Sequence, residues 1–269
     1  MNKTLAWVKL MENPGGGLAA WTDGGKAPSY PEVTGYTIPT LYDYGEKELA
    51  GRCADWLCKI QHRDGWWTGI HTNTAQTFDT SAILEGLTRA FLETKEDRYI
   101  AAANKARQWL LAMRDKNGTL PTEPGKPTQC YTARAAWIVG DLTAAEYWLP
   151  YKSWDERWGS KQRPHYIAYL LEGLHNLGYD ITRVLEGAKH ITGLFPFYSL
   201  TNWIPADGTD TSATIQMAIL YKKNKMSIDH LLPAINMMVT ECGGLKHSAS
   251  ETRMTIWTAK YYLDLLRLI

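Results

Sequence analysis

The sequence predicts an all-α toroid in which six α-hairpins form an inner and an outer circle of helices. Three observations predict it: short strings repeat at multiples of about 44 residues, apolar residues recur at helical spacing, and short connections alternate with long ones. Six units of about 44 residues fill the 269 residues. Because a fixed period of this size is typical of repeat architectures, we expect a single domain over residues 1–269.

Two four-residue strings carry the repeat. Asp-Thr-Ser-Ala at 79–82 returns at 210–213, which is 131 residues later. Leu-Glu-Gly-Leu at 84–87 returns at 171–174, which is 87 residues later. These separations are close to three and two times 44, so we expect both copies of a string to lie in equivalent parts of their hairpins.

Apolar residues three and four positions apart predict amphipathic helices of two kinds. The inner helices, rich in Gly and Ala, are expected near 31–45, 78–93, 130–141, 164–178, 210–223 and 252–268. The outer helices, which carry more charge, are expected near 46–60, 97–113, 143–157, 181–193 and 227–241, and the segment 3–13 closes the ring as the sixth. Pro39 falls inside the first inner helix, which must therefore kink or begin late.

The connections place the functional face. Those that follow an inner helix are short, whereas those that precede one are mostly long and rich in Gly, Pro and Trp, as at 14–30, 61–76, 114–129 and 195–209. Short turns join antiparallel neighbours, so the long loops gather on one face of the ring. Loops on a rigid scaffold commonly carry function, and we expect the site at this mouth.

Composition excludes several classes of partner. With 29 basic and 28 acidic residues the formal net charge is +1, which gives no support for a nucleic-acid or membrane-surface partner. No apolar run approaches the roughly 18 residues that a membrane span requires. Residues 1–13 lack the apolar core of a signal peptide, so we expect a cytoplasmic protein.

One motif connects the chain to known proteins. Residues 61–67, QHRDGWW, match the Q-x-x-x-G-x-W motif of terpene-cyclase repeats. With six hairpins, the chain resembles the α/α-toroid superfamily, which includes six-hairpin glycosidases, polysaccharide lyases, terpenoid cyclases and prenyltransferase β-subunits. The segments 30–40, 164–169 and 257–264 are similar to poorly characterised toroids encoded near bacterial polysaccharide genes.

The sequence also departs from parts of that superfamily. It has no DxDD and no DDxxD, so the acid and the diphosphate-binding cluster of terpene cyclases are missing. Only Cys242 and His247 approach a prenyltransferase-type zinc site, and we interpret them as a buried thiol and a loop imidazole. We therefore expect no metal and no cofactor.

Carboxylates at the mouth are the first candidates for catalysis. The six inner helices point their free N–H groups at one space, which favours anionic ligands such as uronates. Glu32 follows Pro31 at the start of the first inner helix, and Asp79 lies one hairpin along. Together they would suit a glycosidase that uses an acid and a base. Asp210 repeats Asp79, and either residue also suits an N-cap.

A second candidate set surrounds the fourth inner helix. His165 lies beside Tyr166, and Arg163 precedes both. A histidine near a tyrosine could abstract the proton α to a uronate carboxylate, held by Arg163 or Arg134, as in a lyase or an epimerase. A hydrogen-bonded histidine at a helix start explains the same pattern equally well.

Aromatic and rim residues complete the predicted site. The 12 Trp and 15 Tyr against four Phe suit surfaces that stack on sugars. We place Trp66 and Trp203 at the mouth, with Tyr131 and Arg253 on its rim, and expect Trp67 to tie an outer helix to an inner one. The sequence thus predicts an enzyme that acts on bacterial or acidic polysaccharide, by hydrolysis or by lyase or epimerase chemistry. The alternative is a non-catalytic glycan-binding or assembly protein, and cyclase chemistry is disfavoured.

Overall fold

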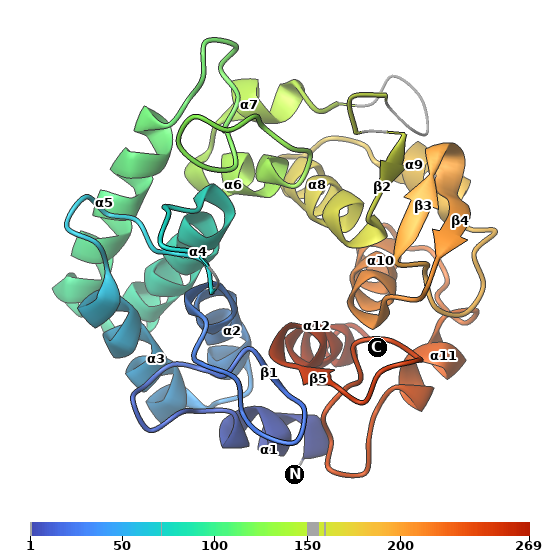
Figure 1. Ribbon diagram of the computed structural model, residues 1–269, viewed down its shortest axis with the longest axis horizontal. Coiled ribbons are helices and arrows are strands. Elements are labelled where there is room, and N and C mark those ends of the chain that lie inside the picture. Colours follow the sequence, from blue (N-terminus) through green and yellow to red (C-terminus); the bar gives the residue numbers. More distant parts are fainter. Residues whose placement is uncertain (1, 71, 150–155, 159) are drawn as a thin grey trace.

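The computed structural model describes residues 2–70, 72–149, 156–158 and 160–269 and shows two concentric rings of helices (Figure 1). The predicted toroid is confirmed. Each inner helix packs on the next around the ring, and the last packs on the first. The inner ring consists of α2 (Pro31–Asp43), α4 (Thr77–Thr94), α6 (Thr132–Val139), α8 (Pro164–Asn176), α10 (Thr211–Lys223) and α12 (Ile256–Leu266).

The outer helices alternate with the inner ones along the chain. They are α1 (Lys3–Leu10), α3 (Lys47–Ile60), α5 (Asp97–Ala112), α7 (Leu142–Glu146), α9 (Thr182–Ala188) and α11 (Leu232–Met237). As predicted, α1 packs against α12, so the two ends of the chain meet and close the ring (Figure 1). Among the described residues, no helix is both long and apolar enough to cross a membrane.

Glycines bring neighbouring inner helices into close contact. A Cβ atom on Gly35 would lie 2.7 Å from the Cα of Ile83, so only glycine allows α2 and α4 to approach this closely. The facing residue on α4 is Gly86, which contacts the Gly35 carbonyl group. Pro39 has no N–H to offer that carbonyl, yet α2 begins at Pro31 and continues past Pro39, so the late start that the proline suggested does not occur.

The second half of the ring departs from the predicted helix ends. The helix expected at 143–157 is only Leu142–Glu146, followed by the 3₁₀ turn η1 (Glu156–Trp158), and residues 150–155 lie outside the described part of the chain. The last inner helix begins at Ile256 and not near 252, because β5 (Met254–Thr255) pairs with β1 (Trp21–Thr22). Main-chain pairing with a distant loop overrides the local helical pattern there.

The long loops contact one another, as expected for loops that gather on one face. Besides the β1–β5 pair, β2 (Lys161–Gln162), β3 (Tyr198–Leu200) and β4 (Ile204–Asp207) form an antiparallel sheet, with the 3₁₀ turn η2 (Thr201–Trp203) between β3 and β4. The loop before α12 also reaches the start of α10, where the Thr211 amide donates to the His247 carbonyl oxygen at 3.0 Å. These pairings build a rim above the starts of the inner helices.

Candidate active site

A cavity of about 490 Å³ opens where the inner helices begin. Its size suits a sugar-sized ligand. Its lining combines carboxylates, basic groups and aromatic rings: Tyr30, Glu32, Tyr36, Gln76, Phe78, Asp79, Tyr131, Arg163, His165, Tyr166, Tyr169, Phe197, Asp210, His247, Arg253 and Trp257. The mouth that the sequence predicts is therefore a real hollow with chemically mixed walls.

Two carboxylates on adjacent helices meet in this cavity. Glu32 lies in the first turn of α2, which begins with Pro31, and Asp79 lies in the first turn of α4. The close approach of α2 and α4 at Gly35 brings these two first turns together. The hydroxyl group of Tyr30, the N-cap residue of α2, interacts with both carboxyl groups.

The electrostatic setting of this pair is unusual. Among the described residues, no cation lies within ion-pair distance of Glu32 or Asp79, and the Oδ2 atom of Asp79 has no hydrogen-bond partner. Burial, with repulsion from Asp79, raises the pKa of Glu32 to about 8. Burial also raises the pKa of Asp79, to about 7, although Tyr30 opposes this. At neutral pH the pair can therefore hold a proton on one side and a charge on the other.

The repeated string takes two different roles. Asp210 is the N-cap of α10, and its carboxylate accepts hydrogen bonds from the Ala213 amide at 3.0 Å and the Ser212 hydroxyl at 2.5 Å. Asp79 cannot do the same, because α4 begins two residues before it and Gln76 is the N-cap. Capping accounts for Asp210 and leaves the carboxylate of Asp79 without that structural task.

One basic side chain, Arg163, lies across the ring from this pair. The order of packing around the ring sets α8 opposite α2 and α10 opposite α4 (Figure 1). Arg163, the N-cap of α8, has its guanidinium group 4.4 Å from the ring of Phe197 and no carboxylate within ion-pair distance among the described residues. Arg253, from the loop before α12, pairs with Glu251 at 2.7 Å and lies 6.0 Å from the centre of the Trp21 ring. Across the cavity from Glu32 and Asp79, the positive charge without a carboxylate partner among the described residues is therefore that of Arg163.

His165 also lies at the cavity, in the first turn of α8 and two residues after Arg163. Its Nδ1 atom lies 2.5 Å from the Oε1 atom of Gln216 on α10, and its ring lies 4.6 Å from that of Tyr169. Burial lowers the pKa of His165, with opposing contributions from Asp210 and Gln216. The imidazole is therefore neutral near pH 7 and can accept a proton.

Aromatic rings form a continuous side of the cavity. Tyr131 and Tyr166, both predicted, have ring centroids 4.7 Å apart, and Tyr131 meets the edge of Phe78 at 5.5 Å. Phe78 in turn contacts Tyr169 at 4.5 Å. Flat rings of this kind are suited to the apolar face of a sugar.

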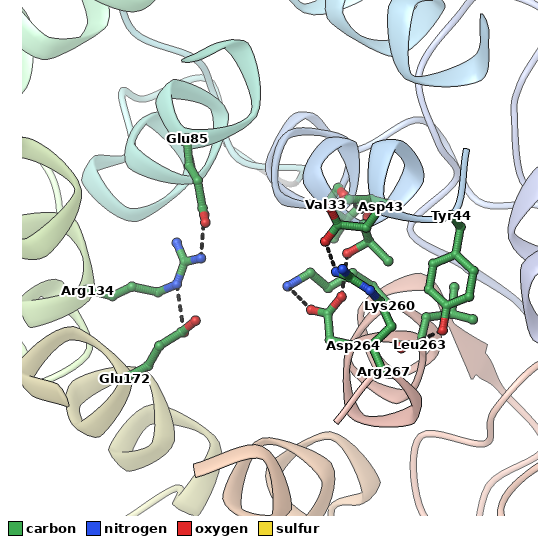
Figure 2. Close-up of polar contacts among 12 residues, drawn as sticks. Val33, Asp43, Tyr44, Glu85, Arg134, Glu172, Lys260, Leu263, Asp264 and Arg267 are labelled. Atoms are coloured by element: carbon green, nitrogen blue, oxygen red, sulfur yellow. Dashed lines mark hydrogen bonds and ion pairs between the residues drawn. The ribbon is translucent and has the colours of Figure 1, made fainter. Parts of the chain in front are cut away.

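The prediction that Arg134 holds a substrate carboxylate is wrong. Arg134 is fully buried in the centre of the ring, where it pairs with Glu85 at 2.6 Å and Glu172 at 2.9 Å (Figure 2). Its guanidinium group lies 5.9 Å from the rings of Phe78 and Tyr169, which line the cavity. Arg134 is therefore outside the lining of the cavity, and its charge already pairs with two protein carboxylates.

The two predicted mouth tryptophans also lie elsewhere. Trp66 stacks on His62 at 4.0 Å in a separate shallow hollow formed by the 60–68 segment. Trp203 is fully buried and packs edge-on against Phe195 at 5.9 Å, since it anchors the turn between β3 and β4. Trp67 behaves as expected: its indole N–H donates to the Leu57 carbonyl oxygen at 3.0 Å, and its amide contacts the Thr80 hydroxyl group at 3.3 Å.

Several lining residues escaped the sequence analysis. Phe78, Tyr36, Phe197 and Trp257 face the cavity, and His247 does so with a buried Nδ1 atom that lacks a hydrogen-bond partner among the described residues. Cys242 is exposed, which corrects the expectation of a buried thiol. The available signal was Gln216, a long polar side chain within the otherwise small or apolar stretch 213–220, and its carbonyl oxygen lies 2.5 Å from the Nδ1 atom of His165.

The described residues contain no cluster of three or more His, Cys, Asp or Glu side chains arranged to hold a metal ion.

Comparisons with known proteins follow the fold. No protein-family profile matches the sequence. No curated protein sequence matches it significantly either. Solved structures do match: an α-amylase from Clostridium perfringens is 11% identical, with a TM-score of 0.78 over 100% of this chain and 98% of its own.

Two further structures extend the range of activities on this fold. An unsaturated glucuronyl hydrolase specific for heparin is 14% identical, with a TM-score of 0.70 over 99% of this chain and 94% of its own. A type II terpene cyclase from Scytonema is 14% identical, with a TM-score of 0.66 over 99% and 95%. At such identities the likeness shows a common α/α-toroid fold and leaves function to be argued from the site.

Proposed function

We propose that this protein is a carbohydrate-active enzyme that hydrolyses a glycosidic bond in an acidic glycan. The observation that carries the proposal is the pair Glu32 and Asp79, two carboxyl groups in one cavity that have raised pKa values and no ion-pair partner among the described residues. Perturbed acids in a cleft mark functional sites more often than structural ones. Glycosidases use two such carboxyl groups on either side of the scissile bond.

We assign one role to each carboxyl group. Glu32, whose pKa is raised by burial and by the charge of Asp79, is the general acid and gives its proton to the glycosidic oxygen as the bond from that oxygen to the anomeric carbon breaks. Asp79, ionised, accepts a proton from the water that attacks the anomeric carbon. Asp79 finishes protonated and Glu32 ionised, so one proton returns to Glu32 before the next turnover. Tyr30 keeps the two groups oriented through its hydroxyl group.

The opposite wall supports an anionic substrate. Arg163 has no protein carboxylate within ion-pair distance among the described residues, although its charge lies at the cavity. A guanidinium group binds a carboxylate or sulfate strongly in such a setting. The aromatic side, with Tyr131 and Tyr166, would stack on the sugar ring. The fold shared with an α-amylase and a heparin-specific glucuronyl hydrolase is compatible with this class of substrate.

The test is a hydrolysis assay on a panel of neutral, uronate-containing and sulfated polysaccharides, with reducing ends as the readout. We expect turnover of an acidic member, and we expect Glu32→Gln and Asp79→Asn each to lower kcat by about 10²- to 10⁴-fold. Asp207→Asn is the matched control, since Asp207 is an exposed carboxylate on β4 outside the cavity. No product from any polysaccharide, or equal activity in all three variants, would sink the proposal.

A second activity, β-elimination or epimerisation at a uronate, is favoured by one observation. His165 is neutral, faces the cavity and stands near Arg163, which suits removal of the proton α to a carboxylate. A lyase would produce unsaturated uronates that absorb in the ultraviolet, and an epimerase would produce no new reducing ends. If saturable binding occurs without any product, and Tyr131→Ala abolishes it, the protein is a glycan-binding protein.

A further inference from the structure

Helices α8 and α10 are joined at the cavity by one side-chain contact. His165 lies in the first turn of α8, and Gln216 lies in the second turn of α10, six residues after the N-cap residue Asp210. The Nδ1 atom of His165 and the Oε1 atom of Gln216 are 2.5 Å apart. Gln216 is only 4% exposed, so it reaches the imidazole from behind and does not line the cavity itself.

The remaining polar atoms of the pair are free of other contacts. No hydrogen bond to the Nε2 atom of His165 occurs among the described residues, and that side chain lines the cavity. The Nε2 atom of Gln216 is buried without a partner. A buried amide group that leaves its own N–H groups unsatisfied costs free energy, so its retention requires a compensating role.

We propose that Gln216 is a positioning residue for His165, whose Nδ1–H donates to the Gln216 carbonyl oxygen so that the Nε2 lone pair faces the substrate. The hydrogen bond on one imidazole nitrogen decides which nitrogen keeps the proton. The side chain of His165 then offers an acceptor to a substrate hydroxyl group or to a proton that leaves carbon. Only this catalytic consequence rests on the proposed function, because the tautomer is a property of the free protein.

The surroundings of His165 are consistent with a neutral ring. Arg163 on its own helix and His247 from the loop before α12 disfavour a positive charge there, while Asp210 at the start of α10 favours one. Burial adds to the first group and lowers the pKa. A neutral imidazole can carry its hydrogen on either nitrogen. Among the described residues, Gln216 is the group that forms a hydrogen bond with a ring nitrogen of His165.

The tautomer can be measured directly by NMR on protein with ¹⁵N-labelled histidine, using long-range correlations between ring carbon-bound hydrogens and both nitrogens. His165 is assigned by the signal that disappears in His165→Asn. We expect its Nδ1 to carry the hydrogen in the wild type and in Gln216→Glu, which keeps an acceptor. In Gln216→Met, which removes the acceptor at similar volume, we expect the Nε2–H form to gain population.

The matched control is Met217→Leu, a volume-conserving change at a fully buried neighbour on the same helix, which should leave the His165 signals unchanged. A wild-type His165 with its hydrogen on Nε2 overturns the proposal, and so does an unchanged tautomer in Gln216→Met. If Gln216→Met does not fold, the wild-type and Gln216→Glu spectra still decide the matter.

Activity supplies the second arm. On a uronate-containing polysaccharide that the wild type cleaves by β-elimination or epimerises, where His165 takes the proton, we expect Gln216→Met to lower kcat by about tenfold to hundredfold, the range typical of residues that orient a reacting group. We expect Gln216→Glu to recover part of that loss with the acidic limb of its pH profile moved to higher pH, because a carboxylate raises the pKa of the imidazole. If no polysaccharide is turned over, the proposed function fails while the NMR result for Gln216 stands.

Discussion

The cavity at the mouth and a second cavity of about 380 Å³ toward the other ends of the inner helices contain the same kinds of charged side chains in opposite arrangements. At the mouth, Glu32 and Asp79 face a cavity without any ion-pair partner among the described residues. Deeper in the ring, Glu85 and Glu172 share Arg134 (Figure 2). Figure 2 also shows Lys260, which pairs with Asp264 at 2.7 Å; both residues are on α12 and line the second cavity.

This difference separates carboxylates that hold the ring together from those available for chemistry. A buried ion pair satisfies its own charges and links neighbouring helices, here α4, α6 and α8 through Arg134. A buried carboxylate without a cation destabilises its charged form and raises its pKa, as at Glu32. The second arrangement lowers stability, so we expect it to persist only where the group serves a function. This is the reason to look for function at the mouth.

The largest effect is expected for Glu32, where loss of the carboxyl group should affect activity but not stability. Replacing it with Gln should lower kcat on the acidic polysaccharide by about 10²- to 10⁴-fold and yet leave the melting temperature unchanged or higher, because a strained acid becomes a neutral amide. Activity and thermal unfolding measured on the same preparation test this. A large loss of stability in Glu32→Gln would mean that the carboxylate is structural, like Glu85.

The opposite change should occur at the inner end. Arg134→Met removes the one cation between Glu85 and Glu172, and we expect the free energy of unfolding to fall by roughly 3 to 5 kcal/mol. Urea unfolding followed by circular dichroism measures it. Combining Arg134→Met with Glu85→Gln and Glu172→Gln should restore much of the loss, and an undiminished loss in the triple variant would contradict the explanation by unpaired charge.

The free energy of unfolding should depend on pH through the titration of Glu32 and Asp79. Glu32 and Asp79 have folded pKa values of about 8 and about 7, above their ordinary values of 4.5 and 3.8. The folded state therefore binds more protons between about pH 4 and 8, and stability falls as pH rises through that window.

The measurement is the difference in unfolding free energy between the wild type and the Glu32→Gln, Asp79→Asn double variant. Relative to that variant, the wild type should lose several kcal/mol of unfolding free energy from pH 4 to pH 8, since each unit of pKa shift corresponds to about 1.4 kcal/mol. Parallel stability curves for the two proteins would show that these carboxylates titrate normally.

The smallest effect distinguishes the two copies of the repeated string. Asp210→Ala removes an N-cap and should cost about 1 kcal/mol of unfolding free energy. Asp79→Ala removes no cap, so it should cost less or even stabilise the fold. Thermal unfolding of the two variants side by side gives the answer, and equal losses would mean that Asp79 has a capping role after all.

Much of the architecture was readable from local patterns. The six inner and six outer helices came from apolar spacing, and the ring closure by residues 3–13 came from counting repeats. The errors have physical causes. The last inner helix was predicted from 252, but Met254 and Thr255 pair with β1 and the helix begins after them. The outer helices of the later hairpins are shorter than predicted, as in α11, where Pro233 allows a helix to begin only just before it.

The candidate site was readable in part. Glu32 and His165 were prominent because neither belongs to a repeated string, and both line the cavity. Trp66, Trp203 and Arg134 were misplaced, since residue type alone cannot distinguish a tryptophan that faces a ligand from one that anchors a loop. The position of Arg134 could not be predicted either, because Glu85 and Glu172, which pair with it, come from two other hairpins.

The sequence by itself determined the toroid, the order of its helices and the face on which the long loops gather, because helical periodicity and connection length are local properties. Only the tertiary structure decided which charges are paired. Asp79 and Asp210 stand in identical four-residue strings, yet Asp210 caps a helix and Asp79 lies beside Glu32, since a shift of three residues in the helix start changes what each carboxylate meets. Pairing and burial depend on groups brought from distant hairpins, and these determine the protonation of the mouth and with it the chemistry that we propose.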